Sequence, residues 1–258
     1  MHVIIVTDLE GISGVDSIEM IPEKNEGYRR ACEYLMADTN AAVDGAFLGG
    51  ATKVTVLDGH GGGRNFIDGM LDPRAEIISA EKFCREPLEG YDAVMCVGAH
   101  AMAGTQNAFL DHTEDSTAWF EYCLNGTPVG EVAIVAYAFG TFGTPLVMAS
   151  GDAATCWEVQ QMFPDAAVAC VKDAKERNRA NCLPQEEALA RIREAAKEGV
   201  RCAGKIAPSV LQMPVEVKIT HTRNDYCDHA AHPGVERNGR TIRKLLKKIN
   251  TYMDLLVL

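Results

Sequence analysis

The chain has 258 residues and a formal net charge of -11, with 47% hydrophobic and 24% charged residues. This length allows one large domain or two unequal ones, and the composition is that of a folded globular protein. The negative charge disfavours nucleic acid and anionic membranes as partners, because both would be repelled. No stretch approaches the roughly 20 apolar residues of a membrane span and no signal-peptide pattern opens the chain, so we expect a cytoplasmic protein.

The nine cysteines are scattered, and none forms a Cys-x-x-Cys pair. Most lie in apolar runs, so we interpret them as reduced, packed thiols. Their spacing excludes a structural zinc finger, and none has an adjacent histidine that could activate it as a nucleophile.

The first part of the chain alternates predicted strands and helices, which is typical of an α/β fold. An apolar run at residues 3–6 predicts a strand buried on both faces, and residues 24–47 repeat apolar side chains at helical spacing. Further strands are predicted at 53–57, 76–79, 92–97, 145–149 and 166–171, a hairpin around Asn125-Gly126, and helices at 131–139 and 152–162. We therefore expect an open, mostly parallel sheet flanked by helices.

The rest of the chain predicts a smaller α+β part. Residues 172–181 are highly charged and are interpreted as the turn that leads to it. The elements predicted there are a helix at 185–197, a half-buried strand at 214–220, a short helix at 225–232, a strand at 236–242 and a closing helix at 245–258. We accordingly divide the chain into an α/β core, residues 1–172, and a smaller part, residues 173–258, that packs on the core.

Side chains that can bind metal ions follow three of the predicted strands. Asp8 and Glu10 follow the first strand, His60 the second and His100 the strand at 92–97, while Glu131 opens a helix. The carboxyl ends of parallel strands meet at one edge of a sheet, so we expect these side chains to converge. A catalytic zinc ion uses three protein ligands, so five candidates suggest two ions bridged by a carboxylate. The mixed nitrogen and oxygen donors suit zinc, and manganese or cobalt would also fit.

Structural alternatives exist for each of these residues taken alone. Asp8 and Glu10 could cap the following helix, and His60 or His100 could be a hydrogen-bonded structural histidine. Their recurrence after strands favours the metal site, which makes residues 1–172 a metal-binding core. The run His60-Gly61-Gly62-Gly63 is similar to the oxyanion loop of esterases, but the chain has neither a Gly-x-Ser-x-Gly elbow nor a Gly-Lys-Ser/Thr phosphate loop.

Three other histidines are candidates for a functional role. His112 lies in the polar loop after His100, where a catalytic or supporting role and a surface position are both open. His229 and His232 are three residues apart on a predicted short helix and could bind metal, although a solvated or capping role is favoured.

Several motifs together carry a family resemblance. They are Asp8-x-Glu10-Gly11-Ile12-Ser13-Gly14, Asp58-Gly59-His60, Gly98-Ala99-His100-Ala101, Val129-Gly130-Glu131 and Ala149-Ser150-Gly151-Asp152, followed by Val171-Lys172 and Pro233-Gly234-Val235-Glu236-Arg237. With these motifs the chain resembles the zinc-dependent D-aminopeptidase (DppA) family over nearly its whole length. The resemblance implies a dinuclear zinc centre on Asp8, Glu10, His60, His100 and Glu131, with His112 matching a histidine proposed as catalytic nucleophile. It also implies removal of N-terminal D-amino acids from short peptides and assembly into homo-oligomers, such as a ring-shaped decamer.

We therefore expect a metal-dependent aminopeptidase in which a dinuclear site polarises the scissile carbonyl. Whether His112 or a metal-bound water attacks stays open at this point. One alternative is another dinuclear metal hydrolase, an amidohydrolase or a phosphoesterase, for which Arg64 is the candidate phosphate clamp. The other is a non-catalytic binding or assembly protein that retains the fold.

Overall fold

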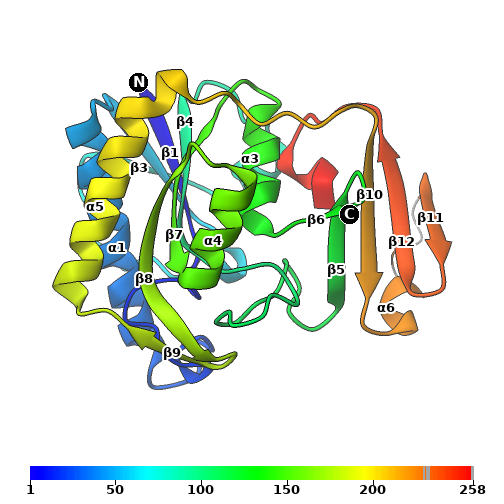
Figure 1. Ribbon diagram of the computed structural model, residues 1–258, viewed down its shortest axis with the longest axis horizontal. Coiled ribbons are helices and arrows are strands. Elements are labelled where there is room, and N and C mark those ends of the chain that lie inside the picture. Colours follow the sequence, from blue (N-terminus) through cyan, green and yellow to red (C-terminus); the bar gives the residue numbers. More distant parts are fainter. Residues whose placement is uncertain (229, 231–232, 257–258) are drawn as a thin grey trace.

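Two β-sheets with helices between and beside them make up the computed structural model, which describes residues 1–228, 230 and 233–256 (Figure 1). The larger sheet has seven strands in the order β3-β2-β1-β4-β7-β8-β9, and the smaller has five in the order β11-β12-β10-β5-β6. All neighbouring strands of the larger sheet are parallel except β8 and β9, and the smaller sheet is antiparallel. The predicted α/β class with a mostly parallel sheet is confirmed.

The strands of the larger sheet carry the residues that reach the functional site. Their bounds are β1 (His2–Thr7), β2 (Lys53–Asp58), β3 (Ala75–Ile78), β4 (Ala93–Ala99), β7 (Leu146–Asp152), β8 (Ala167–Glu176) and β9 (Arg179–Cys182). Along β1, Val3 and Ile5 join the core on one face and Ile4 joins the core on the other. Successive side chains of a strand point to opposite faces, so an unbroken apolar run is what a strand buried on both sides requires.

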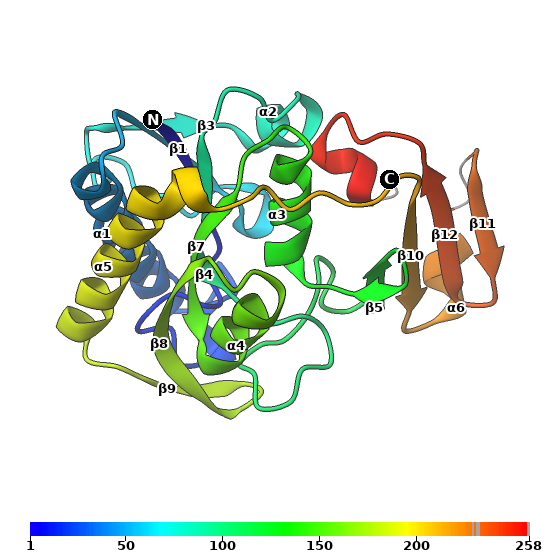
Figure 2. The ribbon, with the colours of Figure 1, turned by 45° about the horizontal axis from the view of Figure 1, so that its top comes forward.

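Helices cover both faces of this sheet. On one face lie α1 (Tyr28–Gly49) and α5 (Gln185–Cys202), which pack against each other, and on the other lie α2 (Ala80–Arg85), α3 (Glu131–Gly140) and α4 (Ala153–Met162). Helix α3 is apolar on nearly all sides because it fills the space between the two sheets (Figures 1 and 2). Its first residue, Glu131, therefore lies at the boundary between the two sheets.

The smaller sheet closes the other side of α3. Its strands are β5 (Trp119–Leu124), β6 (Thr127–Pro128), β10 (Val215–His221), β11 (Val235–Asn238) and β12 (Thr241–Leu246), with α6 (Asn224–Asp228) beside β10. Short 3-10 helices are η1 (Ile18–Met20), η2 (His60–Gly62), η3 (Ala203–Lys205) and η4 (Tyr252–Leu256). The hairpin expected at Asn125-Gly126 is present, with positive φ at both turn residues.

The charged segment 172–181 was predicted as a turn and is instead part of the larger sheet. Strand β8 continues to Glu176 and pairs antiparallel with β9. Its outer residues alternate between exposed and partly buried, and this edge of the sheet tolerates charge because one side of each strand faces water. The helix that follows also runs five residues further than predicted, to Cys202.

The predicted strand at 236–242 is interrupted by a turn, and the predicted helix at 245–258 was wrong where β12 occupies its first residues. Residues 235–246 form the hairpin β11–β12, which turns at Gly239-Arg240 with Gly239 at φ 61°. Pairing with β10 extends β12 to Leu246, so tertiary contacts override the helical spacing of the apolar residues there. Within the described residues, only the short η4 is helical after this strand.

The division at residue 172 stays a prediction. The two sheets draw on overlapping parts of the chain, since β5 and β6 join the smaller sheet while α5 packs on the larger. All nine cysteines are free thiols, as expected. Among the described residues, no helix combines the length and apolar character that crossing a membrane requires.

Candidate metal centre

Five side chains singled out in the sequence lie together beyond the carboxyl ends of β1, β2 and β4. Asp8 is central: its Oδ1 lies 3.0 Å from Nδ1 of His60, and its Oδ2 lies 3.2 Å from Nε2 of His100. Glu10 Oε2 lies 3.0 Å from Nδ1 of His60, and Glu131 Oε1 lies 3.2 Å from Nε2 of His100. Their predicted convergence is confirmed, whereas their role as metal ligands stays a prediction.

Glycines let the loop after β1 lie against the end of β4. The backbone amide of Gly11 donates a hydrogen bond of 2.7 Å to the carbonyl oxygen of Gly98. A Cβ atom on Gly11 would lie 1.9 Å from the carbonyl oxygen of Ala99, and one on Gly98 would lie 2.3 Å from that of Asp8. Any larger residue at either position would push the carboxylates of the loop away from His100.

Two buried charged residues hold the same loop from within the core. Lys172 Nζ donates hydrogen bonds of 2.7 Å to the carbonyl oxygens of Glu10 and of Val15. The carboxylate of Asp38, on α1, accepts hydrogen bonds from the amide and the hydroxyl of Ser13. Burial lowers the pKa of Lys172 to about 8 and raises that of Asp38 to about 7. The loop that carries Glu10 is thus fixed at three points.

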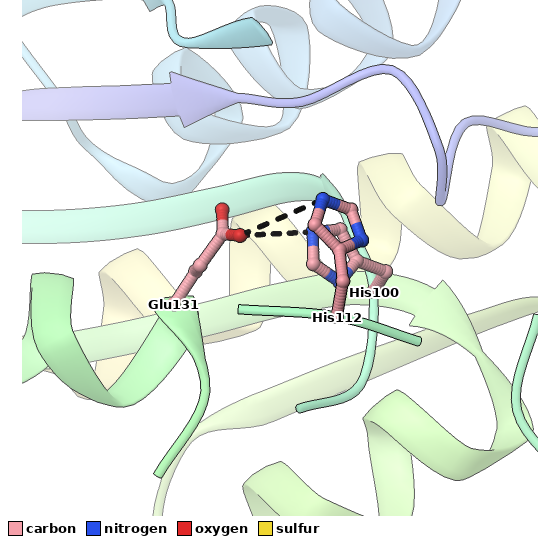
Figure 3. A group of neighbouring side chains, drawn as sticks. All are labelled: His100, His112 and Glu131. Atoms are coloured by element: carbon pink, nitrogen blue, oxygen red, sulfur yellow. Dashed lines mark ion pairs between the residues drawn. The ribbon is translucent and has the colours of Figure 1, made fainter. Parts of the chain in front are cut away.

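The imidazoles of His100 and His112 stack face to face beside Glu131 (Figure 3). Their centroids are 3.8 Å apart with an interplanar angle of 9°. In each ring Nδ1 faces a backbone carbonyl, that of Ala101 at 3.1 Å for His100 and that of Leu110 at 2.8 Å for His112. A carbonyl only accepts, so Nδ1 carries a proton in each ring, and Nε2 is the nitrogen that faces the site.

The loop that brings His112 to the site is held in an uncommon backbone conformation. Asn107, Leu110 and Glu114 adopt positive φ angles of 57°, 54° and 58°. Such angles cost free energy in residues other than glycine and persist only where surrounding contacts enforce them. Arg177, at the β8–β9 turn, supplies such a contact, because its guanidinium binds the side chain and the carbonyl of Asp111.

The charges of the site are strongly coupled. Burial disfavours the charged form of His60, but the negative charges of Glu10 and Asp8 outweigh burial and raise its pKa to about 11. His100 is buried too, and Glu131 and Asp8 raise its pKa well above the usual value. Burial opposes ionisation of Asp8, yet its contacts with His100 and His60 hold its pKa well below the usual value. The carboxylates therefore stabilise positive charge at this position.

The surroundings of the candidate ligand atoms are those expected of a metal site. Glu10 Oε2 and His100 Nε2 are buried, and neither makes a hydrogen bond of regular geometry, although other candidate ligands lie 3.0 to 3.2 Å away. Buried polar atoms are normally satisfied, so two orphans facing one point indicate that another ligand completes the site. Two groups place ligand atoms within 4.8 Å of one another, namely Asp8, Glu10 and His100, and His100, His112 and Glu131. Oxygen and imidazole donors in this number fit zinc.

Sequence reasoning missed two residues that extend the site. Glu114 donates its backbone amide to Glu131 Oε1 at 2.7 Å, and its own Oε1 accepts a hydrogen bond of 2.6 Å from the hydroxyl of Tyr252. Burial, with the negative charge of Glu131 nearby, raises the pKa of Glu114 to about 7. The nearness of Glu114 to His112 was a usable signal, but nothing in the chain order pointed to Tyr252. His229 and His232 lie outside the described residues.

Comparisons with known proteins identify the family of this chain. The family model described as D-aminopeptidase, peptidase M55, matches residues 1–257. A D-aminopeptidase of Bacillus subtilis strain 168 is 27% identical over 212 residues, which are 81% of this chain and 77% of that protein. A solved structure has the same fold, with a TM-score of 0.92 and 24% sequence identity. It is described as the Zn-dependent D-aminopeptidase DppA from Bacillus subtilis, a self-compartmentalizing protease. The match covers 100% of this chain and 96% of that chain. This chain therefore belongs to the D-aminopeptidase family, peptidase M55, and is an enzyme of the metallopeptidase class.

Proposed function

We propose that this enzyme is a dinuclear zinc aminopeptidase that releases N-terminal residues, D-amino acids among them, from short peptides. The observation that carries the proposal is the position of Asp8, whose two carboxylate oxygens face His60 and His100 separately. A carboxylate placed between two imidazoles can bridge two cations. Glu10 and His60 would then hold one ion together with Asp8, and His100 and Glu131 would hold the other.

When bound, zinc supplies Lewis-acid polarisation of the peptide carbonyl and activation of water at neutral pH. The chain's own residues position the ligands and the histidine that can act in catalysis. Lys172 and Asp38 keep the Glu10 loop in place, so that the ligands need no rearrangement when substrate arrives. The Leu110 carbonyl holds the His112 ring with Nε2 facing the site, where it can take a proton or attack as a nucleophile.

Relatives' names support the substrate class. The curated relative and the solved structure are both D-aminopeptidases, and the structure is called self-compartmentalizing. We extend the D-residue preference to this chain on that basis. We likewise propose that the chain forms a homo-oligomer, with a ring-shaped decamer as the specific expectation, which size-exclusion chromatography with light scattering would measure. A cytoplasmic location stays a prediction.

The phosphoesterase alternative finds less support. Its candidate clamp, Arg64, is an exposed side chain that lies 3.6 Å from Glu23 at the surface. The cavity that borders Asp8 and His100 is not lined by Arg64. A phosphoryl group at the site would therefore meet carboxylates without this guanidinium to offset them.

The decisive experiment compares D-Ala and L-Ala p-nitroanilides and dipeptides, with and without chelator. We expect cleavage that chelation abolishes and that zinc restores, with two zinc ions per chain by elemental analysis. Manganese and cobalt are added in parallel arms. Activity that resists chelation would refute the metal mechanism, hydrolysis of phosphoesters alone would refute the peptidase assignment, and one ion per chain would refute the dinuclear site.

A further inference from the structure

An apolar cavity opens directly beside the candidate metal ligands. Its volume is about 250 Å³, and one end of it is bordered by Asp8, His100 and Glu131. The remaining walls come mainly from β1, β2, β4, α2, α3 and η4, elements that are distant in the chain and meet next to the site. The apolar wall residues are Leu57, Phe83, Val132, Val135, Tyr252 and Leu256.

The two ends of this cavity differ in their access to solvent. At the ligand end, the side chains of Asp8 and Glu131 are 19% and 26% exposed. At the other end, Phe83 and Val135 are 3% and 4% exposed. A molecule held by the candidate metal ligands can therefore place one of its groups in this cavity from the ligand end.

The chemistry of the walls selects what can enter. Apart from Asp8, His100, Glu114 and Glu131, the described residues that line the cavity are uncharged. A charged side chain placed at the deep end would lose its hydration without gaining a partner, which is costly. An apolar cavity of about 150 Å³ is large enough to bind benzene, so this one has room for a branched or aromatic side chain.

Glu114 supplies a separate recognition element at the mouth. Its carboxylate is fixed by the Tyr252 hydroxyl at 2.6 Å, and its backbone is fixed by Glu131. Among the described residues, Glu114 forms no ion pair with a lysine, arginine or histidine. A carboxylate placed in this way is matched by a cationic group on the ligand, and a peptide carries one at its amino terminus.

We propose that this cavity receives the side chain of the peptide's N-terminal residue, with a preference for branched and aromatic apolar groups, and that Glu114 binds its α-ammonium group. The proposal rests on the aminopeptidase function proposed above. It assigns to the chain both the side-chain specificity and the requirement for a free amino terminus. Neither depends on which residue is the nucleophile.

The side-chain part is tested by binding of leucinol and alaninol, in both enantiomers, to the zinc-loaded protein by calorimetry. These ligands share the ammonium group and have no bond for the enzyme to cleave. We expect leucinol to bind about tenfold to a hundredfold more tightly, because of the added buried methylenes. Val135→Ile and Val135→Phe, which fill the cavity in two steps, should reduce this ratio stepwise. Val210→Phe, at an exposed position, is the matched control and should leave it unchanged.

The ammonium part is tested with leucinol against 4-methyl-1-pentanol, which lacks the amine. The wild-type protein should favour leucinol at least tenfold, and Glu114→Gln should reduce that preference about tenfold while zinc content stays constant. Glu81→Gln, an exposed carboxylate on α2, is the control. The result is a ratio within one protein, so partial loss of folded material does not change it.

The outcomes separate this proposal from the proposed function. A protein that cleaves peptides but binds leucinol and alaninol equally would retain the activity and refute the pocket. Unchanged ratios in both Val135 variants would do the same, and an unchanged amine preference in Glu114→Gln would refute the role of Glu114. If the protein cleaves no peptide yet shows the expected binding pattern, the proposed activity is refuted and the assignment of the pocket is supported.

Discussion

Two groups of charged side chains meet the loop that follows β1, and they differ in how completely they are hydrogen-bonded. Lys172 and Asp38 are almost fully buried, and every bond described for them ends on a backbone or hydroxyl partner. In the other group, Glu10 and His100 each keep a buried ligand atom that faces only other candidate ligands and makes no hydrogen bond of regular geometry. The first group is complete as it stands, and the second is complete only with a further ligand.

The difference teaches how to distinguish structural from functional charge. Burying a charge is costly, and in a group kept for stability its own contacts offset part of that cost. A site kept for a ligand leaves the last contacts to that ligand. Variants in the first group should therefore act on folding, and variants in the second on metal content and catalysis.

The largest effect is expected from Asp8→Asn. An amide cannot serve as a charged bridge between two cations, so zinc content should fall and kcat/KM for the alanyl peptides should fall by more than about a hundredfold. Elemental analysis and initial rates measure both. Asp165→Asn, at an exposed position, is the control. Full zinc content in Asp8→Asn would show that this carboxylate is not a ligand.

His112→Ala separates catalysis from metal binding within the second group. We expect kcat to fall about 10²- to 10⁴-fold with zinc content intact, since Nε2 of His112 lies 3.9 Å from Glu131 Oε1 while that of His100 lies 3.2 Å away. His2→Ala, far from the site, is the control. Loss of zinc would instead make His112 a ligand, as its place beside His100 and Glu131 also allows.

Lys172→Met tests the first group. It leaves the carbonyls of Glu10 and Val15 buried without a donor, so the free energy of unfolding of the chelated protein should fall by about 2–4 kcal/mol. Zinc affinity should fall by about 10- to 100-fold because Glu10 loses its support. Urea unfolding measures the change in stability, and competition with a chelator measures the change in zinc affinity. Lys175→Met, at an exposed position on the same strand, should behave as the wild type. Unchanged stability and zinc affinity in Lys172→Met would contradict the distinction between the two groups.

The smallest effect concerns the pH dependence of Asp38. Burial raises its pKa from 3.8 to about 7, against the hydrogen bonds from Ser13, so the folded state binds a proton that the unfolded state has lost. The stability it contributes is full below pH 3.8 and is lost as pH rises towards 7. Relative to Asp38→Asn, the wild type should lose on the order of 4 kcal/mol of unfolding free energy across this range. Parallel curves for the two proteins would contradict this shift.

Much of the site could be predicted because it follows from local pattern. Asp8, His60 and His100 follow apolar strands, and the carboxyl ends of parallel strands share one edge. The crossover helix between β1 and β2 identified the strands as parallel without any tertiary information. Helix α4 was likewise readable, because Asp152 caps it by accepting a hydrogen bond of 2.8 Å from the amide of Thr155.

Other features could not be predicted because distant segments decide them. Residues 241–246 are a strand only because β10 and β11 lie beside them, and a strand's propensity depends on such neighbours. The charged residues after Lys172 suggested a surface turn, yet the lysine itself is 1% exposed. A buried lysine cannot be told from an exposed one by its place in the sequence, since burial depends on the acceptors around it.

The sequence by itself determined the fold class and the five side chains that meet at the strand ends, because side-chain periodicity and the parallel connection are local properties. Only the tertiary structure decided how the site is supported and extended. Lys172 and Glu10 are 162 residues apart, and Tyr252 and Glu114 are 138 apart. Neither pair has a local signal, because their partners come together only when the core packs.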